Sequence, residues 1–218
     1  MRINHHPDDS TILAYVAGAL EEGFSLVLAA HMESCPSCSR YVRDAMAFGG
    51  ALLTSLPSAE APDKGLADVW KRIEASAPPE EPFVPHPTAD DTFPAVLIPY
   101  LGDRLDRVRW RTLVPGIRQC VLKGVECGSG SVRLFSILPG TAIPKHTHRG
   151  SELTLVLKGA YHDEVGRFQA GDLADLDSSV EHRQVVDGNT PCICLIATDG
   201  LLRFKGNVSR MLQPILGI

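Results

Sequence analysis

Three residues near the N-terminus, His31, Cys35 and Cys38, have the types and the spacing of metal ligands. His31 and Cys35 are four residues apart, so both project from one face at the end of a helix. The C-x-x-C turn then brings a second thiolate back to that face. Imidazole and thiolate are ligands of Zn²⁺, which takes four tetrahedral groups in structural sites. The sequence therefore predicts a zinc site whose fourth ligand comes from a distant segment, and His5 and His6 are the candidates.

The same residues also have an interpretation without a metal. The two cysteines could form a redox-active pair or match C-x-x-C by chance, with His31 only interacting with a helix C-terminus. We favour metal binding because the three residues are clustered and two further histidines lie upstream. A core of three short helices also needs a stabilising cross-link, which a bound metal supplies.

A second group of candidate ligands lies in the C-terminal half and comprises His146, His148, Glu152 and His182. His146 and His148 are alternate residues, which point to the same side of a strand. Three imidazoles and one carboxylate facing the interior of a β-barrel can bind Zn²⁺, Mn²⁺, Fe²⁺, Ni²⁺ or Cu²⁺. The alternative is a barrel that keeps its fold and holds no metal.

The elements that would position these ligands divide the chain into three parts. Residues 1–77 are predicted to be helical, with three helices that end near Leu56. The Pro-rich segment 78–94 is predicted to be an extended linker. In residues 95–218, short β-type runs are separated by glycine-containing turns, which is typical of an antiparallel sandwich or barrel. The predicted fold class is thus a small all-α domain followed by an all-β barrel.

A fourth predicted helix lies next to the linker. Its apolar residues have the i, i+3, i+4, i+7 spacing of an amphipathic stripe: Leu66, Val69, Trp70 and Ile73. Such a helix either packs on its own domain or docks in a groove of a partner.

Composition and charge exclude several classes of function. No window contains the roughly 18 apolar residues needed to span a bilayer, and the N-terminus lacks the apolar core of a signal peptide. We therefore expect a cytoplasmic protein with no membrane partner, whose six cysteines are thiols or metal ligands. The net charge of −5 argues against direct nucleic-acid binding. Residues 1–77 carry most of the excess negative charge, which fits either a basic protein partner or a solvated acidic surface.

The N-terminal pattern resembles a known family. His6 followed by His31-Met32-Glu33-Ser34-Cys35-Pro36-Ser37-Cys38 is similar to the zinc-binding anti-sigma factors. The resemblance implies a zinc site of His6, His31, Cys35 and Cys38 in a helical domain that wraps an extracytoplasmic-function sigma factor. In that family a fourth helix also contacts sigma, which favours the docking interpretation of the Leu66–Ile73 stripe.

The C-terminal pattern resembles the cupins. The string from Gly140 to Gly159 matches the first cupin motif, Gly-x₅-His-x-His-x₃-Glu-x₆-Gly, throughout. The second motif is matched at Gly171, Asp172 and His182, but its Pro-x-Gly and trailing Asn are not matched in full. The resemblance implies that His146, His148, Glu152 and His182 hold Zn²⁺ or another divalent transition metal.

An anti-sigma domain joined to a cupin resembles the ChrR type of anti-sigma factor. The likeness implies that the helical domain suffices to hold the sigma factor. It also implies that the cupin domain responds to oxidative stress, as singlet oxygen or organic hydroperoxide, and that the chain is not an enzyme. The competing hypothesis is a cupin-type metal-dependent dioxygenase with an accessory helical domain, since a three-His, one-Glu set can leave coordination positions open.

A route for the signal can also be hypothesised. Oxidant chemistry at the barrel metal, or at Cys192 and Cys194 on one face of a predicted strand, would alter the barrel's contacts with the helical domain. The linker would then be exposed to a protease. The simpler interpretation is that the two cysteines are small buried hydrophobic residues.

Overall fold

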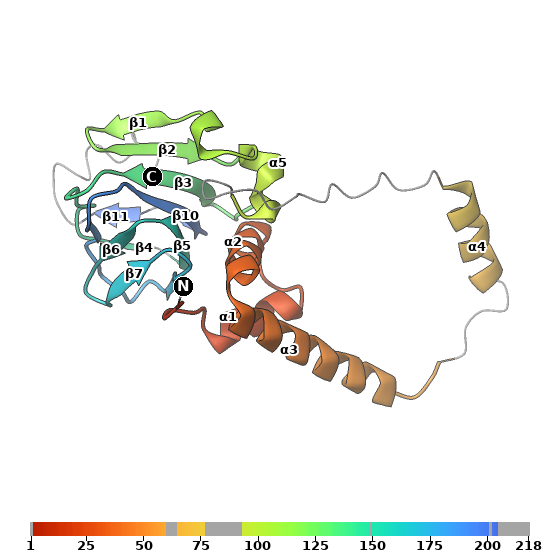
Figure 1. Ribbon diagram of the computed structural model, residues 1–218. Coiled ribbons are helices and arrows are strands. Elements are labelled where there is room, and N and C mark those ends of the chain that lie inside the picture. The colour runs from red at the N-terminus through yellow and green to blue at the C-terminus, as the bar shows by residue number, and fades with distance from the viewer. Residues whose placement is uncertain (1, 60–64, 77–92, 149, 201, 205–218) are drawn as a thin grey trace.

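The computed structural model describes residues 2–59, 65–76, 93–148, 150–200 and 202–204, and for His148 and residues 202–204 only the backbone. Most of the predicted linker 78–94 and the end of the predicted barrel domain, residues 205–218, lie outside the described residues. The predicted fold class, helices followed by an antiparallel β-domain, is confirmed (Figure 1). No helix in the described ranges is long and apolar enough to cross a membrane.

The helical elements come mainly from the first 76 residues. They are α1 (Asp9–Val16), α2 (Glu22–Ser34), α3 (Pro36–Ser55) and α4 (Gly65–Ala75), followed by the short turns η1 (Ala95–Leu97), α5 (Ile98–Leu101) and η2 (Leu105–Arg107).

The β-domain consists of antiparallel sheets. One sheet has six strands in the order β1-β2-β3-β10-β5-β8, a second has the order β7-β6-β9, and β11 pairs with β4. The strands are β1 (Arg111–Val114), β2 (Ile117–Val121), β3 (Ser131–Ile137), β4 (His146–His148), β5 (Glu152–Lys158), β6 (Ala160–His162), β7 (Arg167–Gln169), β8 (Leu173–Leu176), β9 (Val185–Val186), β10 (Cys192–Thr198) and β11 (Leu202–Phe204).

The central strands of the six-stranded sheet are buried on both faces. In β10, Cys192, Cys194 and Ile196 face the barrel interior, where they pack with residues of β6 and β7. The alternate residues Ile193 and Leu195 face outward, yet they are buried as well. Since successive side chains of a strand point to opposite faces, a second layer must cover the outer face of this sheet.

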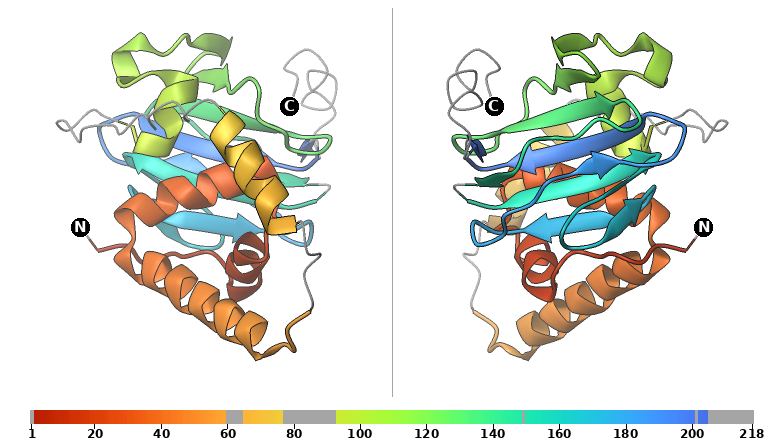
Figure 2. Two further views of the ribbon diagram at one scale, coloured as in Figure 1. Left: turned by 90° about the vertical axis from the view of Figure 1, so that its right-hand side faces the viewer. Right: turned by 90° about the vertical axis from the view of Figure 1, so that its left-hand side faces the viewer.

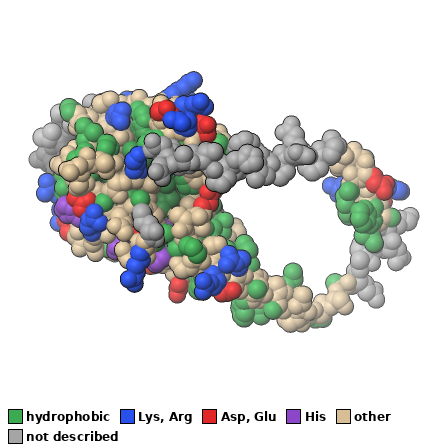
Figure 3. All heavy atoms as spheres, in the orientation of Figure 1, with side chains coloured by type: hydrophobic (Ala, Val, Ile, Leu, Met, Phe, Trp, Pro, Cys, Tyr) green, Lys and Arg blue, Asp and Glu red, His purple; other side chains and the backbone are tan. Residues whose placement is uncertain are grey.

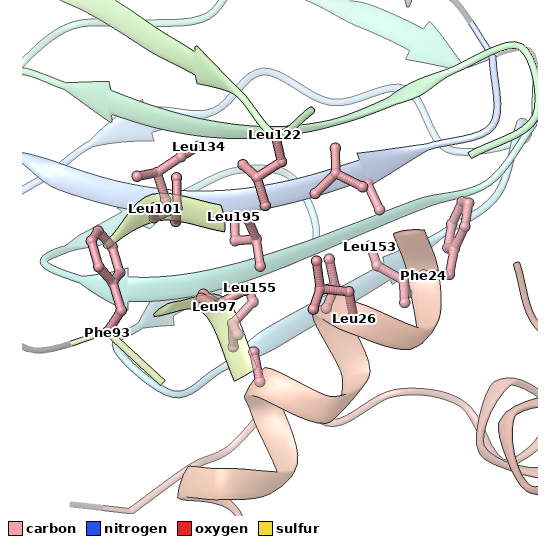
Figure 4. Packing of buried hydrophobic residues seen from close by; sticks show 14 of the residues in the cluster. Phe24, Leu26, Phe93, Leu97, Leu101, Leu122, Leu134, Leu153, Leu155 and Leu195 are labelled. Atoms are coloured by element: carbon pink, nitrogen blue, oxygen red, sulfur yellow. The ribbon is translucent and has the colours of Figure 1, made fainter. Parts of the chain in front are cut away.

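Helix α2 provides that second layer. Its buried residues Phe24, Leu26 and Val27 pack against Leu153 and Leu195 of the sheet, in one continuous apolar cluster (Figure 4). Residues of η1 and α5 complete the layer beside it. The helical region and the barrel thus share a hydrophobic core.

Both ends of α2 are tied to the β-domain by hydrogen bonds. At its start, the Gly23 N–H donates to the Glu126 carbonyl (2.8 Å), and the Glu126 N–H donates to the Glu22 carboxylate (3.0 Å). At its end, the Glu33 carboxylate accepts the N–H groups of Ala95 (2.6 Å) and Val96 (2.9 Å). These bonds fix the position of α2 along the sheet.

Helices α1 and α3 form a smaller cluster beside α2. Ile12 of α1 packs with Cys35, Cys38 and Val42 at the beginning of α3. Beyond Val42, α3 extends away from the rest of the fold (Figure 1), and Figure 2 shows the helix running below the barrel. Helix α4 has no buried residue.

Candidate metal centres and docking surface

Four side chains converge where the N-terminal segment, α2 and α3 meet. The potential ligand atoms of His6, His31, Cys35 and Cys38 all lie within 4.8 Å of one another. His6 is exposed at the rim of the group, and the other three are buried. His31 is in the last turn of α2, Cys35 joins α2 to α3, and Cys38 is in the first turn of α3.

The distances in this cluster fit a tetrahedral metal site. His6 Nδ1 is 3.4 Å from Cys35 Sγ and 3.3 Å from Cys38 Sγ, and His31 Nε2 is 3.4 Å from Cys38 Sγ. Tetrahedral Zn²⁺ with bonds of about 2.0–2.3 Å places its ligand atoms roughly 3.3–3.8 Å apart. Two imidazoles and two thiolates also form a common donor set of structural zinc sites.

The protonation states in the cluster also bear on metal binding. Burial lowers the pKa of His31 to about 4, so this imidazole is neutral near pH 7 and has a lone pair to donate. Burial and the neighbouring Cys35 raise the pKa of Cys38 to about 12. The thiols would therefore stay protonated by themselves, and a divalent cation would supply the positive charge that allows them to ionise.

The two adjacent N-terminal histidines have different surroundings. His6 faces the two cysteines, whereas the ring of His5 lies 4.2 Å from that of Phe168 and its Nε2 lies 3.1 Å from the Arg167 carbonyl oxygen. The geometry therefore favours His6 over His5 as the fourth member of the cluster.

A second convergence lies inside the β-domain. His146 begins β4, Glu152 begins β5, and His182 forms an isolated antiparallel bridge with His146. All three side chains are buried. His182 Nε2 lies 3.1 Å from His146 Nε2 and 4.0 Å from Glu152 Oε1. The backbone of His148 lies in β4, but its imidazole is outside the described part of the chain.

The tautomers of the two histidines make this group a candidate cation site. His146 Nδ1 is 2.9 Å from the Pro144 carbonyl oxygen, and His182 Nδ1 is 3.0 Å from Asp163 Oδ2. Both oxygens accept hydrogen bonds, so both Nδ1 atoms carry the proton. The two Nε2 lone pairs consequently face each other, and they repel unless a proton or a metal ion lies between them.

Asp163 is a member of this site that the sequence analysis did not identify. Burial by itself would raise the pKa of this carboxyl, but hydrogen bonds from His182, Gly166 and Val165 outweigh that effect and lower it. The ionised carboxylate therefore holds His182 in the orientation that a metal requires. Asp163 lies in a turn 19 residues before His182, and no local sequence pattern distinguishes it from an ordinary turn aspartate.

Cys192 and Cys194 lie next to each other in the barrel interior, as their spacing predicts. Their Sγ atoms are 3.4 Å apart, and both residues are buried. The neighbouring Cys192 thiol and burial raise the pKa of Cys194 well above its ordinary value, so it is a poor nucleophile near pH 7.

A third feature is an exposed apolar surface on α3 and α4, which we call the helical docking surface. Leu52 and Leu53 of α3 are 54% and 70% exposed, and Leu66 and Trp70 of α4 are 69% and 55% exposed. Figure 3 shows hydrophobic side chains gathered on both helices. The described members are Met46, Phe48, Leu52, Leu53, Leu56, Leu66, Val69, Trp70 and Ile73. Exposed apolar residues in this number indicate a binding surface.

Comparison with known proteins shows the family of the chain. The ChrR cupin-like domain matches residues 103–201. The whole chain is 41% identical to the anti-sigma-E factor ChrR of Cereibacter sphaeroides, and all 218 residues and the full length of that protein are covered. The chain belongs to the ChrR family. In the crystal structure of Rhodobacter sphaeroides SigE in complex with the anti-sigma ChrR, a chain 40% identical to this ChrR-family protein matches with a TM-score of 0.75, over 91% of this chain and 100% of that chain.

Family membership confirms the resemblance inferred from the two motifs. The match to the ChrR relative covers the chain from end to end. It therefore includes the exposed half of α3, which the sequence analysis did not single out. The sequence analysis predicted a helix here but did not identify Met46, Phe48 and Leu52 as exposed; the available signal was that a core of three short helices is too small to bury every apolar residue.

Proposed function

We propose that this chain is a cytoplasmic anti-sigma factor, which binds an extracytoplasmic-function sigma factor and inhibits it stoichiometrically, without turnover. The observation that carries the proposal is the helical docking surface, together with the His6–His31–Cys35–Cys38 cluster at the beginning of α3. Family membership supports the choice of partner, since a ChrR relative is found in complex with SigE.

In this proposal the N-terminal cluster fixes the position of α3. Cys35 and Cys38 belong to the start of α3, His31 belongs to α2, and His6 belongs to the N-terminal segment. A Zn²⁺ ion held by the four residues would cross-link three elements and fix the direction in which α3 leaves the fold. The sigma factor would then meet the docking surface in a fixed orientation, and the acidic charge of residues 1–77 would complement a basic partner.

We also propose that the barrel senses oxidative stress, as singlet oxygen or organic hydroperoxide, and that it is not an enzyme. His146, His148, Glu152 and His182 would hold Zn²⁺ or another divalent transition metal, and this metal would supply the place at which an oxidant could react. Asp163 and the Pro144 carbonyl fix the two imidazoles. The shared core of α2 and the sheet offers a path from the barrel to the helices.

A binding experiment tests the first proposal. The full-length chain is mixed with an extracytoplasmic-function sigma factor of the same organism, and the complex is measured by gel filtration and calorimetry. We expect a one-to-one complex that Trp70→Asp weakens at least tenfold, because a charge would be buried in an apolar interface. Lys71→Asp, on the next position of the same helix, is the matched control and should retain most of the affinity. Absence of a complex with the wild-type chain would refute the proposal.

A reporter experiment tests the sensing proposal. A Glu152→Ala variant should still repress a sigma-dependent reporter but lose its induction by singlet oxygen or organic hydroperoxide. Unchanged induction would exclude the barrel site from sensing. Catalytic turnover of a substrate by the wild-type barrel would instead support a metal-dependent dioxygenase.

A further inference from the structure

The N-terminal segment, residues 2–8, is bound along one edge of the β-domain. The N–H groups of Asn4 and His5 both donate to Asp172 Oδ1, at 2.7 and 3.1 Å. The Leu173 N–H donates to the His5 carbonyl at 3.2 Å, and the Asp8 N–H donates to the Asp175 carboxylate at 3.0 Å. The segment that carries His6 is therefore attached to the barrel on both sides of that residue.

Asp172 is the centre of this attachment. Its side chain is completely buried, and its second oxygen accepts the Gln169 N–H at 2.9 Å. A buried carboxylate that accepts three backbone N–H groups forms charge-assisted hydrogen bonds, which are stronger than neutral ones. Two of these three bonds position the chain directly before His6, whereas the other three candidate ligands lie in α2, in α3 or between them.

The preceding residue, Gly171, contacts the other histidine of the cluster. Its carbonyl oxygen lies 3.0 Å from His31 Nδ1, so this nitrogen carries the proton and Nε2 is left to face Cys38. Gly171 has φ +90°, and a Cβ there would lie 2.9 Å from Ile3. A side chain at position 171 would thus disturb both the backbone and the N-terminal segment.

We propose that the Gly171–Asp172 turn of the barrel is a positioning element of the N-terminal metal site: the Gly171 carbonyl orients His31, and the Asp172 carboxylate holds the chain that carries His6. The inference rests on the proposed metal binding by the N-terminal cluster. The site is accordingly built from both halves of the chain, and its metal is retained firmly only while this barrel edge stays in place.

Release of Co²⁺ from the full-length protein tests the proposal. Co²⁺ bound to Cys35 and Cys38 would give thiolate charge-transfer absorption, whereas the candidate ligands of the barrel include no thiolate. Loss of this band in excess chelator therefore reports the N-terminal site alone. We expect Asp172→Asn to accelerate the loss about tenfold, which is the lower end of the effect of removing a partner of a metal-ligating histidine. Asp177→Asn is the matched control: Asp172 precedes β8 and Asp177 follows it, and in the described part of the chain the Asp177 side chain bonds only to Ser179.

A second variant excludes a general weakening of the barrel. Asn4→Pro removes the N–H that donates to Asp172 and leaves every barrel residue in place, and it should also accelerate release. In both variants the thermal unfolding midpoint of the barrel and its own metal content should stay near the wild-type values. Wild-type release rates in both variants would overturn this inference alone. Absence of the thiolate band in the wild-type protein would overturn the proposed metal site as well.

Discussion

At the scale of single residues, the His182–Asp163 pair makes the candidate barrel site testable. Asp163 bonds to His182 Nδ1 at 3.0 Å and fixes the ring with Nε2 towards His146 and Glu152. We expect Asp163→Asn to lower the metal affinity of the barrel about 10- to 100-fold, since the orientation and basicity of His182 both decline. Competition with a fluorescent chelator measures this. Asp187→Asn, which changes only a carboxylate that accepts two hydrogen bonds from Arg167, is the control. An unaltered affinity would show that Asp163 does not support the site.

The same pair predicts a pH dependence. Burial by itself would lower the pKa of His182, but Asp163 and Glu152 outweigh it and raise the pKa above the ordinary value of 6.5. A protonated imidazole cannot bind a metal, so the affinity of the barrel should begin to fall as the pH drops through a value above 6.5. In Asp163→Asn this fall should begin at a lower pH. Chelator competition between pH 5.5 and 8.5 measures both curves, and identical onsets would contradict the assignment.

A third residue, Tyr161, carries a buried polar atom. Its hydroxyl has no hydrogen-bond partner among the described residues, and burial raises its pKa well above the ordinary value. A buried group without a partner keeps its desolvation cost. We therefore expect Tyr161→Phe to leave the free energy of unfolding of the metal-free protein unchanged or to raise it by up to about 1 kcal/mol. Urea unfolding measures this; a loss of more than 1 kcal/mol would mean that the hydroxyl is bonded.

At the scale of elements, α2 packs both on helix α3 and on the β-domain. Its start packs so closely on the β-domain that a Cβ on Gly23 would lie 2.6 Å from Val132 Cγ2 and 2.8 Å from Cys127 Sγ. Gly23→Ala should therefore push α2 from the sheet and lower the free energy of unfolding by about 1–3 kcal/mol. Gly50→Ala in α3 is the matched control, because nothing lies within 4 Å of its Cβ position, and alanine in a helix should raise stability by about 0.5–1 kcal/mol. Equal effects of the two substitutions would contradict the packing argument.

Local patterns explain which of these elements the sequence could predict. Helix periodicity, the ligand types and the cupin string are properties of short segments, so the helices could be predicted and both groups of candidate ligands could be proposed from the sequence. The docking of α2 on β5 and β10 could not, because its partners lie more than 100 residues away. One signal was present: Cys192–Ala197 is apolar without alternation, which is typical of a strand covered on both faces.

The groups that orient the candidate ligand histidines could not be predicted from the sequence either. The Pro144 carbonyl, the Gly171 carbonyl and the Asp163 carboxylate act on the histidines through backbone atoms or through long-range contacts. Gly171 and Asp172 matched a cupin motif, and that match alone assigned them to the barrel. Their contacts with Asn4, His5 and His31 arise only when the two halves of the chain meet.

At the scale of the whole molecule, the two candidate metal sites are connected by one pair of strands. Glu152 begins β5, whose residues 152–155 pair with β8. At the other end of this pair, the Val156 N–H donates to the Asp172 carbonyl (3.0 Å), and the Gly171 N–H donates to the Val156 carbonyl (2.8 Å). The turn that contacts His31 and the N-terminal segment is thus bonded to the strand that carries Glu152.

This connection predicts that the two sites are thermodynamically linked. A metal ion bound by Glu152 would restrain β5, and through it the Gly171–Asp172 turn, so metal at the N-terminal site should leave more slowly when the barrel is loaded. We expect a factor of about five, the lower end of common coupling energies between sites. The measurement compares the rate at which the thiolate–Co²⁺ band is lost from the wild-type protein, whose barrel is filled with metal, and from Glu152→Ala, whose barrel is empty. Elemental analysis verifies the metal content of both proteins.

A second way of emptying the barrel separates occupancy from the substitution itself. His146→Ala removes a ligand from β4, which does not pair with β5 or β8. If occupancy is what restrains the turn, both variants should accelerate N-terminal release to the same extent, and filling the N-terminal site should raise the metal affinity of the wild-type barrel by the same factor, since coupling is reciprocal. Faster release in Glu152→Ala alone would indicate a local effect on β5. Equal release from all three proteins would mean that the sites are independent, and a signal from the barrel would then have to reach the docking surface through α2.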